Sequence, residues 1–145
     1  GTHGRSLYKA NIAPLQKMNT EVLAKQNHIF DIASIRKNSS WGRSWSQWRD
    51  AYIPEVTIPF YTKSNGNLTI AIYSGETKVN SIAVDANKGY NEANFDVSFS
   101  KAGMKAFEKA NKKASLRKAS NGVYYLPKGK YIVKIGAETS EFEVK

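Results

Sequence analysis

The chain has 145 residues, of which 41% are hydrophobic and 12% aromatic, enough for one compact domain with its own core. It contains no cysteine, which excludes thiolate zinc sites, iron–sulfur clusters, cysteine nucleophiles and disulfide switches. Lys and Arg number 22 against 12 Asp and Glu, and the resulting net charge of +10 favours polyanions or anionic surfaces without specifying either.

No stretch approaches the roughly 18 apolar residues of a transmembrane helix, so no membrane-spanning segment is predicted. The first residues lack the apolar run of a signal peptide, and the chain lacks an initiator Met. We therefore expect a fragment or a processed product, for which a missing signal carries no information about secretion.

The first third of the chain shows little regular periodicity. Leu15, Met18 and Val22 stand at helical spacing and predict one or two short helical turns, and residues 28–32 then predict a strand. Residues 38–50 hold all three tryptophans among Ser, Gly, Arg and Gln. This composition is typical of a long loop or an irregular helix packed by its aromatic rings.

From residue 56 onward the dominant period is two, as expected of strands with one buried face. Pro59 favours an edge position for the first of these strands, because proline cannot donate to a ladder. Turns at residues 63–67 and 75–78 predict two consecutive hairpins. The predicted strands are residues 56–61, 68–72, 79–84, 90–98, 130–135 and 140–144, of which the last two form a closing hairpin. Strands this short at such regular spacing favour an antiparallel β-sandwich.

One segment departs from the two-residue period and predicts a helix inserted between strands, at residues 101–118. Ser100 is its expected N-cap, and Asn121 with Gly122 is its expected stop. The apolar residues at helical spacing, which we expect to lie on the sandwich, are Met104, Phe107, Ala110 and Ala114.

The start of the chain resembles a known family. The run Gly1-Thr2-His3-Gly4-Arg5-Ser6-Leu7-Tyr8, followed by Ile12-Ala13-Pro14-Leu15-Gln16, is similar to the last strand and exit of a bacterial sortilin-like, neuraminidase-repeat β-propeller. In such proteins the exit is followed by segments similar to Glu21-Val22-Leu23-Ala24 and His28-Ile29-Phe30.

The remainder resembles the immunoglobulin-like sandwich of flagellar hook-capping proteins. The similarity rests on Glu55-Val56-Thr57-Ile58-Pro59-Phe60, on Gly89 and Asn91 before Phe95-Asp96, and on Leu126-Pro127-Lys128-Gly129-Lys130-Tyr131. The chain departs from this pattern at Phe95, where Trp is frequent, and in the helix after Ser100.

Together, the pattern and the resemblance predict two parts. Residues 1–27 are expected to be the end of a propeller and a linker. Residues 28–145 are expected to form a mainly β, immunoglobulin-like antiparallel β-sandwich with one inserted α-helix, and the fold as a whole has an irregular N-terminal extension. The resemblance implies that any catalysis of the parent protein, often labelled a glycosyl hydrolase, resides in the propeller. It also implies a secreted, periplasmic or cell-surface location. The expected partner is the N-terminal β-propeller of the same polypeptide, and the chain is expected to be monomeric.

The aromatic residues Trp41, Trp45, Trp48 and Tyr52 are the first candidate site. On a helix they would form one stripe, although Gly42 and the neighbouring serines weaken the helix prediction. The simplest interpretation is that these rings pack on the sandwich or on the propeller. The sharper hypothesis is a carbohydrate-binding platform, because flat indole rings suit the C–H faces of sugars.

The polar face of the predicted helix is the second candidate site. Lys105, Lys109, Lys112 and Lys113 lie on it, and Glu108 is its only acid. Such a face is usually solvated, and the alternative is contact with an anionic polymer or a membrane surface. Nucleic acid is not expected as a partner, because no aromatic residue is interleaved with these lysines.

Patterns that could support catalysis are weak. Ser-x-x-Lys occurs four times without its partner motifs, and His3 and His28 are the only histidines, which excludes a three-histidine metal site. Residues 85–92 resemble a cation loop but lack its Glu at position twelve, so a β-turn is simpler. Glu92 and Asp96 share one face of a predicted strand without other marks of a glycosidase cleft.

We therefore predict a non-catalytic C-terminal accessory domain that packs against, orients or anchors a secreted propeller, with no cofactor and no metal. Two alternatives stay open. One is a carbohydrate-binding module that uses the tryptophan platform, and the other is a domain that binds polyanions through its basic helix.

Overall fold

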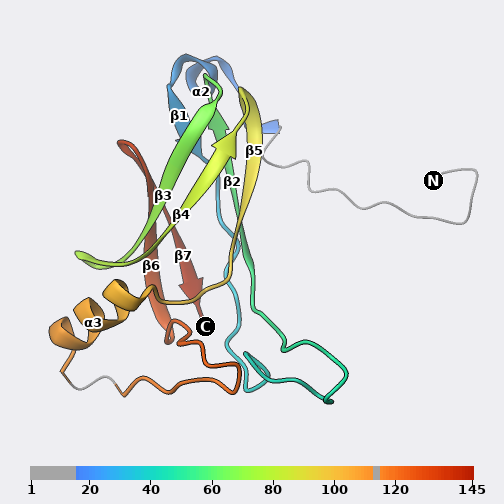
Figure 1. Ribbon diagram of the computed structural model, residues 1–145. Coiled ribbons are helices and arrows are strands. Elements are labelled where there is room, and N and C mark those ends of the chain that lie inside the picture. Colours follow the sequence, from blue (N-terminus) through green and yellow to red (C-terminus); the bar gives the residue numbers. More distant parts are fainter. Residues whose placement is uncertain (1–15, 113–114) are drawn as a thin grey trace, which may run out of the picture.

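The computed structural model describes residues 16–112 and 115–145. The strands of this part of the chain form two antiparallel sheets, ordered β1-β2-β5 and β4-β3-β6-β7, which pack into a sandwich (Figure 1). The fold is an immunoglobulin-like β-sandwich with a helix between β5 and β6, as predicted. The propeller strand expected at the start of the chain lies outside the described residues.

The elements lie close to the predicted ranges. In chain order they are α2 (Thr20–Ala24), β1 (Asn27–Ile29), β2 (Val56–Thr62), β3 (Gly66–Ser74), β4 (Thr77–Ala86), β5 (Gly89–Phe95), α3 (Lys101–Ala110), β6 (Gly129–Ile135) and β7 (Glu138–Val144). All strands predicted from the two-residue period are present, and only their ends differ.

The first predicted hairpin is wrong. β2 pairs with β1 and β5, whereas β3 pairs with β4 and β6, so the chain crosses from one sheet to the other after Thr62. It crosses back between β4 and β5, and Lys88 N donates to Asn65 Oδ1 at 2.6 Å, which ties the two crossing turns together. The predicted β3–β4 and β6–β7 hairpins are confirmed.

Pro59 does not mark an edge strand, because β2 is the central strand of its sheet. Phe30 N donates to Pro59 O at 3.0 Å, one residue beyond the end of β1 at Ile29. Since the nitrogen and carbonyl of one strand residue face the same neighbour, the missing N–H of Pro59 faces β1 and leaves the pairing with β5 intact. Proline thus explains why β1 stops where it does.

The core lies between the two sheets. Phe95 and Phe142 meet across the sandwich with ring centroids 6.2 Å apart, and Phe142 stacks on Tyr131 at 5.5 Å. The Tyr131 hydroxyl donates to Pro127 O at 2.8 Å, and burial raises the pKa of this hydroxyl. Other fully buried side chains are Ile58, Phe60, Ile70, Ile72, Val79, Leu126, Val133 and Ile135.

A smaller apolar cluster covers the outer face of β2. Val22 of α2 packs with Phe30 and Tyr61, so β2 is buried on both faces along most of its length. Lys25, which follows α2, donates to both carboxylate oxygens of Glu138 at 2.9 and 3.0 Å. Helix α2 and the residue that follows it therefore contact both sheets, through β2 and β7.

Helix α3 begins as predicted and ends earlier. Ser100 Oγ accepts a hydrogen bond from Gly103 N at 3.0 Å, which confirms the N-cap. The helix ends at Ala110, where the backbone and side-chain nitrogens of Asn111 both donate to Phe107 O at 2.8 and 3.0 Å. The predicted continuation to residue 118 is wrong, because Asn111 satisfies the last carbonyl groups first.

The predicted apolar side of the helix is confirmed in part. Phe107 is buried and Met104 is half-buried, but Ala110 is exposed, and Ala114 lies outside the described residues. Phe107 contacts Phe99 with ring centroids 5.1 Å apart.

Gly103 is the second buried residue of α3. An ideal Cβ at this position would lie 1.9 Å from Val79 O, so the helix backbone rests directly on strand β4. Only glycine permits this approach, because no side-chain carbon fits between the two backbones.

The predicted helix stop is also wrong. Asn121 and Gly122 belong to a turn, in which Gly122 N donates to Ala119 O and Ala119 N to Val123 O, both at 2.9 Å. The turn sets Lys118 opposite Tyr124 in an isolated bridge.

A segment from early in the chain covers the outer edge of β7. Ile35 N donates to Glu143 O at 2.9 Å, Lys145 N to Ile35 O at 2.9 Å and Lys37 N to Lys145 O at 2.8 Å. These bonds pair the segment with β7 in parallel and leave the end of that strand closed to further pairing.

Candidate functional site

The aromatic and basic candidate residues gather at one end of the sandwich. Figure 1 shows the tryptophan-bearing loop, helix α3 and the connection from α3 to β6 at the end opposite α2. We call residues 43–52 the tryptophan loop.

The tryptophan loop is closed at its base by two backbone hydrogen bonds. Gly42 N donates to Tyr52 O at 2.8 Å and Tyr52 N donates to Arg43 O at 2.9 Å. Inside the loop the Ser44 hydroxyl donates to the carbonyls of Ser46 and Arg49. These bonds hold a compact surface loop whose ends are close together.

Two tryptophans of this loop are almost fully exposed. Trp45 and Trp48 each have 86% of their surface accessible, and Tyr52 and Ile53 beside them are 48% and 56% exposed. Tryptophan is usually well buried, so two such exposed rings on one short loop make it a candidate contact surface.

Trp41 is buried instead. Only 5% of its surface is exposed, its ring meets Tyr125 edge-on at 5.8 Å, and Lys37 Nζ lies 5.7 Å from its centroid. Its indole N–H has no acceptor among the described residues. A four-ring platform of Trp41, Trp45, Trp48 and Tyr52 is therefore wrong, since one ring packs on the sandwich and no helix aligns the others.

Gly42 separates the buried ring from the exposed ones. Its φ is +72°, and an ideal Cβ would lie 2.6 Å from Ala119 Cβ and 2.9 Å from the Tyr125 ring. Asn121 N donates to Gly42 O at 3.0 Å. The chain can turn out into the loop here because glycine tolerates both the left-handed backbone and the close approach.

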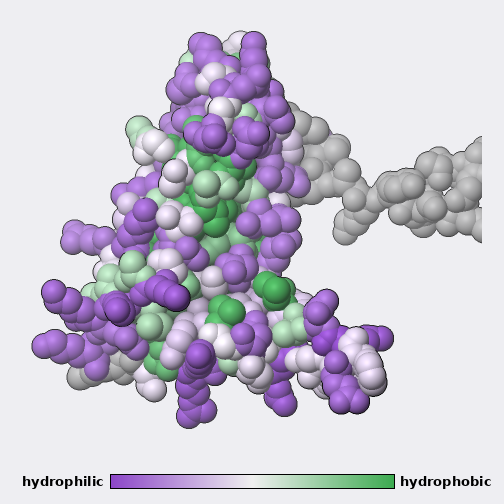
Figure 2. Space-filling view, in the orientation of Figure 1, coloured by the Kyte–Doolittle hydropathy of each residue, from purple (hydrophilic) through white to green (hydrophobic). Residues whose placement is uncertain are grey.

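The lysines on the polar side of α3 point into solvent. Lys105 and Lys109 of α3 are exposed, as is Lys112 beyond the end of the helix, and Lys113 lies outside the described residues. Figure 2 shows hydrophilic side chains projecting around this helix. The predicted basic face is thus present on the helix only in part, through Lys105 and Lys109, because α3 has ten residues rather than the predicted eighteen.

The residues considered for catalysis make local structural contacts. His28 packs edge-on against Phe30 at 4.9 Å, and its Nδ1 lies 3.5 Å from Glu138. Asp96 accepts hydrogen bonds from Ser98 N at 3.2 Å and Ser98 Oγ at 2.7 Å.

Glu92 likewise serves a neighbour on its own strand. It accepts the Tyr90 hydroxyl at 2.6 Å, and burial together with this bond raises the pKa of Tyr90 to about 12. Glu92 lies on β5, whereas Asp96 follows the end of that strand.

Within residues 16–112 and 115–145, no three or more His, Asp and Glu side chains come close enough to hold a metal ion. In the same part of the chain, no helix is long and apolar enough to cross a membrane.

The architecture places the chain in the class of immunoglobulin-like β-sandwiches, with an aromatic loop and a basic helix at one end. No protein-family model, no curated protein and no solved structure matches it. The resemblance to propeller and hook-capping proteins therefore stays a prediction.

Proposed function

We propose that this chain is a non-catalytic accessory domain of a secreted bacterial protein, docked onto a β-propeller of the same polypeptide through the tryptophan loop. The observation that carries the proposal is the 86% exposure of both Trp45 and Trp48 on a loop held by backbone hydrogen bonds. A held loop loses little conformational entropy when it docks.

The size of the loop surface favours a partner on the same polypeptide. Burying an aromatic ring removes about 150–250 Å² from water, worth roughly 4–6 kcal/mol at about 25 cal/mol per Å² before the costs of docking. Two such rings fall short of the roughly 800 Å² per partner that a stable complex between separate proteins buries. A covalent tether supplies a high effective concentration, which makes a contact of this size sufficient.

The polar groups also support a binding role. His28 Nδ1 lies 3.5 Å from Glu138 without a hydrogen bond, and Asp96 accepts a hydrogen bond from the neighbouring Ser98. The proposal assigns any chemistry of the parent protein to the propeller.

A carbohydrate-binding module is the second candidate, because exposed indole rings also suit sugar faces. The same exposure of Trp45 and Trp48 favours it, although the platform would have two tryptophans rather than three. The two candidates differ in what covers these rings: a propeller in the longer polypeptide, or an oligosaccharide in solution.

Fluorescence quenching distinguishes them. We compare this chain with the longer polypeptide that includes the preceding residues, using acrylamide, because iodide is concentrated around a chain of net charge +10. Trp45→Phe/Trp48→Phe variants of both proteins isolate the loop signal, and Trp41→Phe is the matched control for the buried ring.

We expect the loop tryptophans to be strongly quenched in this chain and protected in the longer polypeptide, with no emission shift from neutral oligosaccharides. Equal quenching of the loop tryptophans in both proteins would contradict the docking proposal. A saturable emission shift with an oligosaccharide, lost in the Trp45→Phe/Trp48→Phe variant, would then establish the carbohydrate-binding module.

A further inference from the structure

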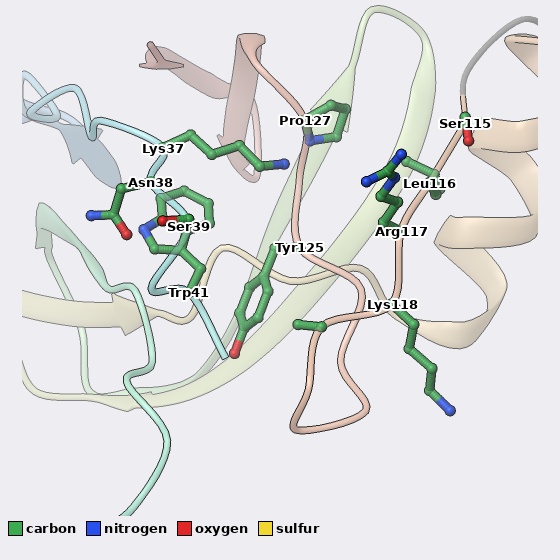
Figure 3. Close-up of a pocket in the computed structure, with 11 residues that line it drawn as sticks. Lys37, Asn38, Ser39, Trp41, Ser115, Leu116, Arg117, Lys118, Tyr125 and Pro127 are labelled. Atoms are coloured by element: carbon green, nitrogen blue, oxygen red, sulfur yellow. The ribbon is translucent and has the colours of Figure 1, made fainter. Parts of the chain in front are cut away.

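An open groove of about 440 Å³ runs beside the base of the tryptophan loop (Figure 3). One wall is the segment that carries Lys37 and Trp41, and the opposite wall carries Arg117 and Lys118. Tyr125 lies between the two walls. Two segments that are 80 residues apart in the chain, at 37 and 117, thus bring cations to one concave surface.

A second groove of about 530 Å³ adjoins the first. It lies against the first turns of α3, where Lys101, Met104 and Lys105 line it. Lys118 lines both grooves, so the two are neighbours along the connection from α3 to β6. We call the two grooves together the basic track, and the cations that line it extend from Lys37 to Lys105 of α3.

Cations outnumber acids by five to one in the lining of the basic track. The cations that line it are Lys37, Lys101, Lys105, Arg117 and Lys118. None of the five forms an ion pair with a carboxylate of the described residues. Asp96 is the only acid in the lining, and Ser98 already engages it.

Lys37 shows that the track is more than a solvated face. Its ammonium donates to Leu126 O at 3.0 Å and lies 5.7 Å from the centroid of the buried Trp41 ring. Burial and the nearby Lys128 lower the pKa of Lys37, as expected of a partly buried cation that forms no ion pair with a described carboxylate. An anion in the groove would supply the missing counter-charge.

We propose that the basic track binds an acidic polysaccharide, whose carboxylate or sulfate groups lie along the cations from Lys37 to Lys105. A concave track disfavours a flat membrane surface, which would instead meet the convex outer side of α3. Nucleic acid is disfavoured because three of the four rings that line the track, Trp41, Tyr125 and Phe99, are 5%, 7% and 9% exposed, which leaves only the half-buried Tyr124 for a base to stack on. The proposal is independent of the tryptophan loop.

The test compares two triple variants that lose the same charge. The track variant is Lys37→Met/Arg117→Met/Lys118→Met, and the matched control is Lys63→Met/Lys78→Met/Lys88→Met, at exposed positions outside both the track and the basic face of α3. Binding to a heparin octasaccharide and to oligogalacturonate is measured by calorimetry between 25 and 200 mM salt, with dextran and oligothymidylate as competitors.

We expect the track variant to bind at least tenfold more weakly and the control less than threefold more weakly. The slope of log affinity against log salt should fall by about two to three in the track variant, since each lost cation releases about one counterion fewer. Dextran should not compete, and oligothymidylate should compete at least tenfold more weakly than heparin.

Equal losses in the two triple variants would show attraction to net charge alone and overturn the proposal. Competition by oligothymidylate as strong as by heparin would overturn the assignment to a polysaccharide, and no measurable binding at 25 mM salt would overturn the site itself. Because Lys37→Met removes the donor to Leu126 O, the double variant Arg117→Met/Lys118→Met is measured as well. It keeps that contact and should still lose at least fivefold in affinity.

Discussion

Replacing Gly103 with Ala should destabilise this protein, although the same change in most helices is stabilising. Helix propensity alone favours Ala by about 1 kcal/mol. The new Cβ, however, would lie 1.9 Å from Val79 O, where real Cβ contacts are essentially never under 3.0 Å. The helix must therefore retreat from β4 by at least 1.1 Å (3.0 minus 1.9).

The cost follows from what the retreat loosens. A gap of this width forfeits about a quarter to a half of the packing energy across it, and complete truncation of a buried Phe costs about 3–5 kcal/mol. Phe107 would therefore lose about 1–2.5 kcal/mol, and the hydrogen bond from Ser100 N to Val79 O, 3.0 Å long, about 1 kcal/mol more. After the propensity gain is subtracted, a net loss of about 1–2.5 kcal/mol is expected.

Urea unfolding followed by circular dichroism measures this loss. Ala106→Gly, at an exposed position of the same helix, is the control that reports propensity alone and should cost about 1 kcal/mol. If the clash acts by lifting Phe107, the double variant Gly103→Ala/Phe107→Ala should cost less than the sum of the single variants. A Gly103→Ala protein as stable as the parent, or more stable, would refute the close contact between α3 and β4.

Two further predictions concern surface charges. Lys25 holds the pKa of Glu138 below its usual value of 4.5. The contact should therefore stabilise the fold fully at pH values above 4.5, and this stabilisation should be lost as the pH falls through the lowered pKa. Because both side chains are partly exposed, Glu138→Gln should lower the free energy of unfolding by no more than about 1 kcal/mol at pH 7 and by nearly nothing at pH 2. An equal loss at both pH values would contradict this pH dependence. Lys109→Glu/Lys112→Glu should change the free energy of unfolding by less than about 0.5 kcal/mol, because exposed charges contribute little singly. A loss above about 1 kcal/mol in urea unfolding would show that these lysines make contacts within the fold.

The strands were predictable because a two-residue period is a direct consequence of burying one face. Ile70 and Ile72 are buried in the core, as are Phe142 and Val144, whereas the intervening Ala71 and Glu143 are more exposed. The crossing after Thr62 was not predictable, because a turn of Lys, Ser and Asn serves a hairpin and a sheet crossing equally well. What decides between them is the burial of β2 on both faces, which depends on Val22, far away in the chain.

The sequence predicted those features of the candidate site that depend on residues close together in the chain. The spacing of the tryptophans is real, but Gly42 at φ +72° divides them into one buried ring and two exposed ones. The helix was correctly located and its end misplaced, since Asn111 terminates it ahead of further Ala and Lys residues. The meeting of Lys37 with Arg117 has no signal in the sequence, because the two belong to segments joined only by the fold.

The pairing of Ile35 with the end of β7 sets the order in which a growing chain can complete its fold. The backbone of Ile35 cannot pair with Glu143 until a further 108 residues have been made. At about 5–20 residues per second, a ribosome needs roughly 5–20 s for this length of chain. The Trp41 ring has no partner to pack against until Tyr125 has been made, 84 residues after it. The end of the sandwich that carries both proposed binding surfaces therefore cannot take shape until late in translation, after most of the chain has been made.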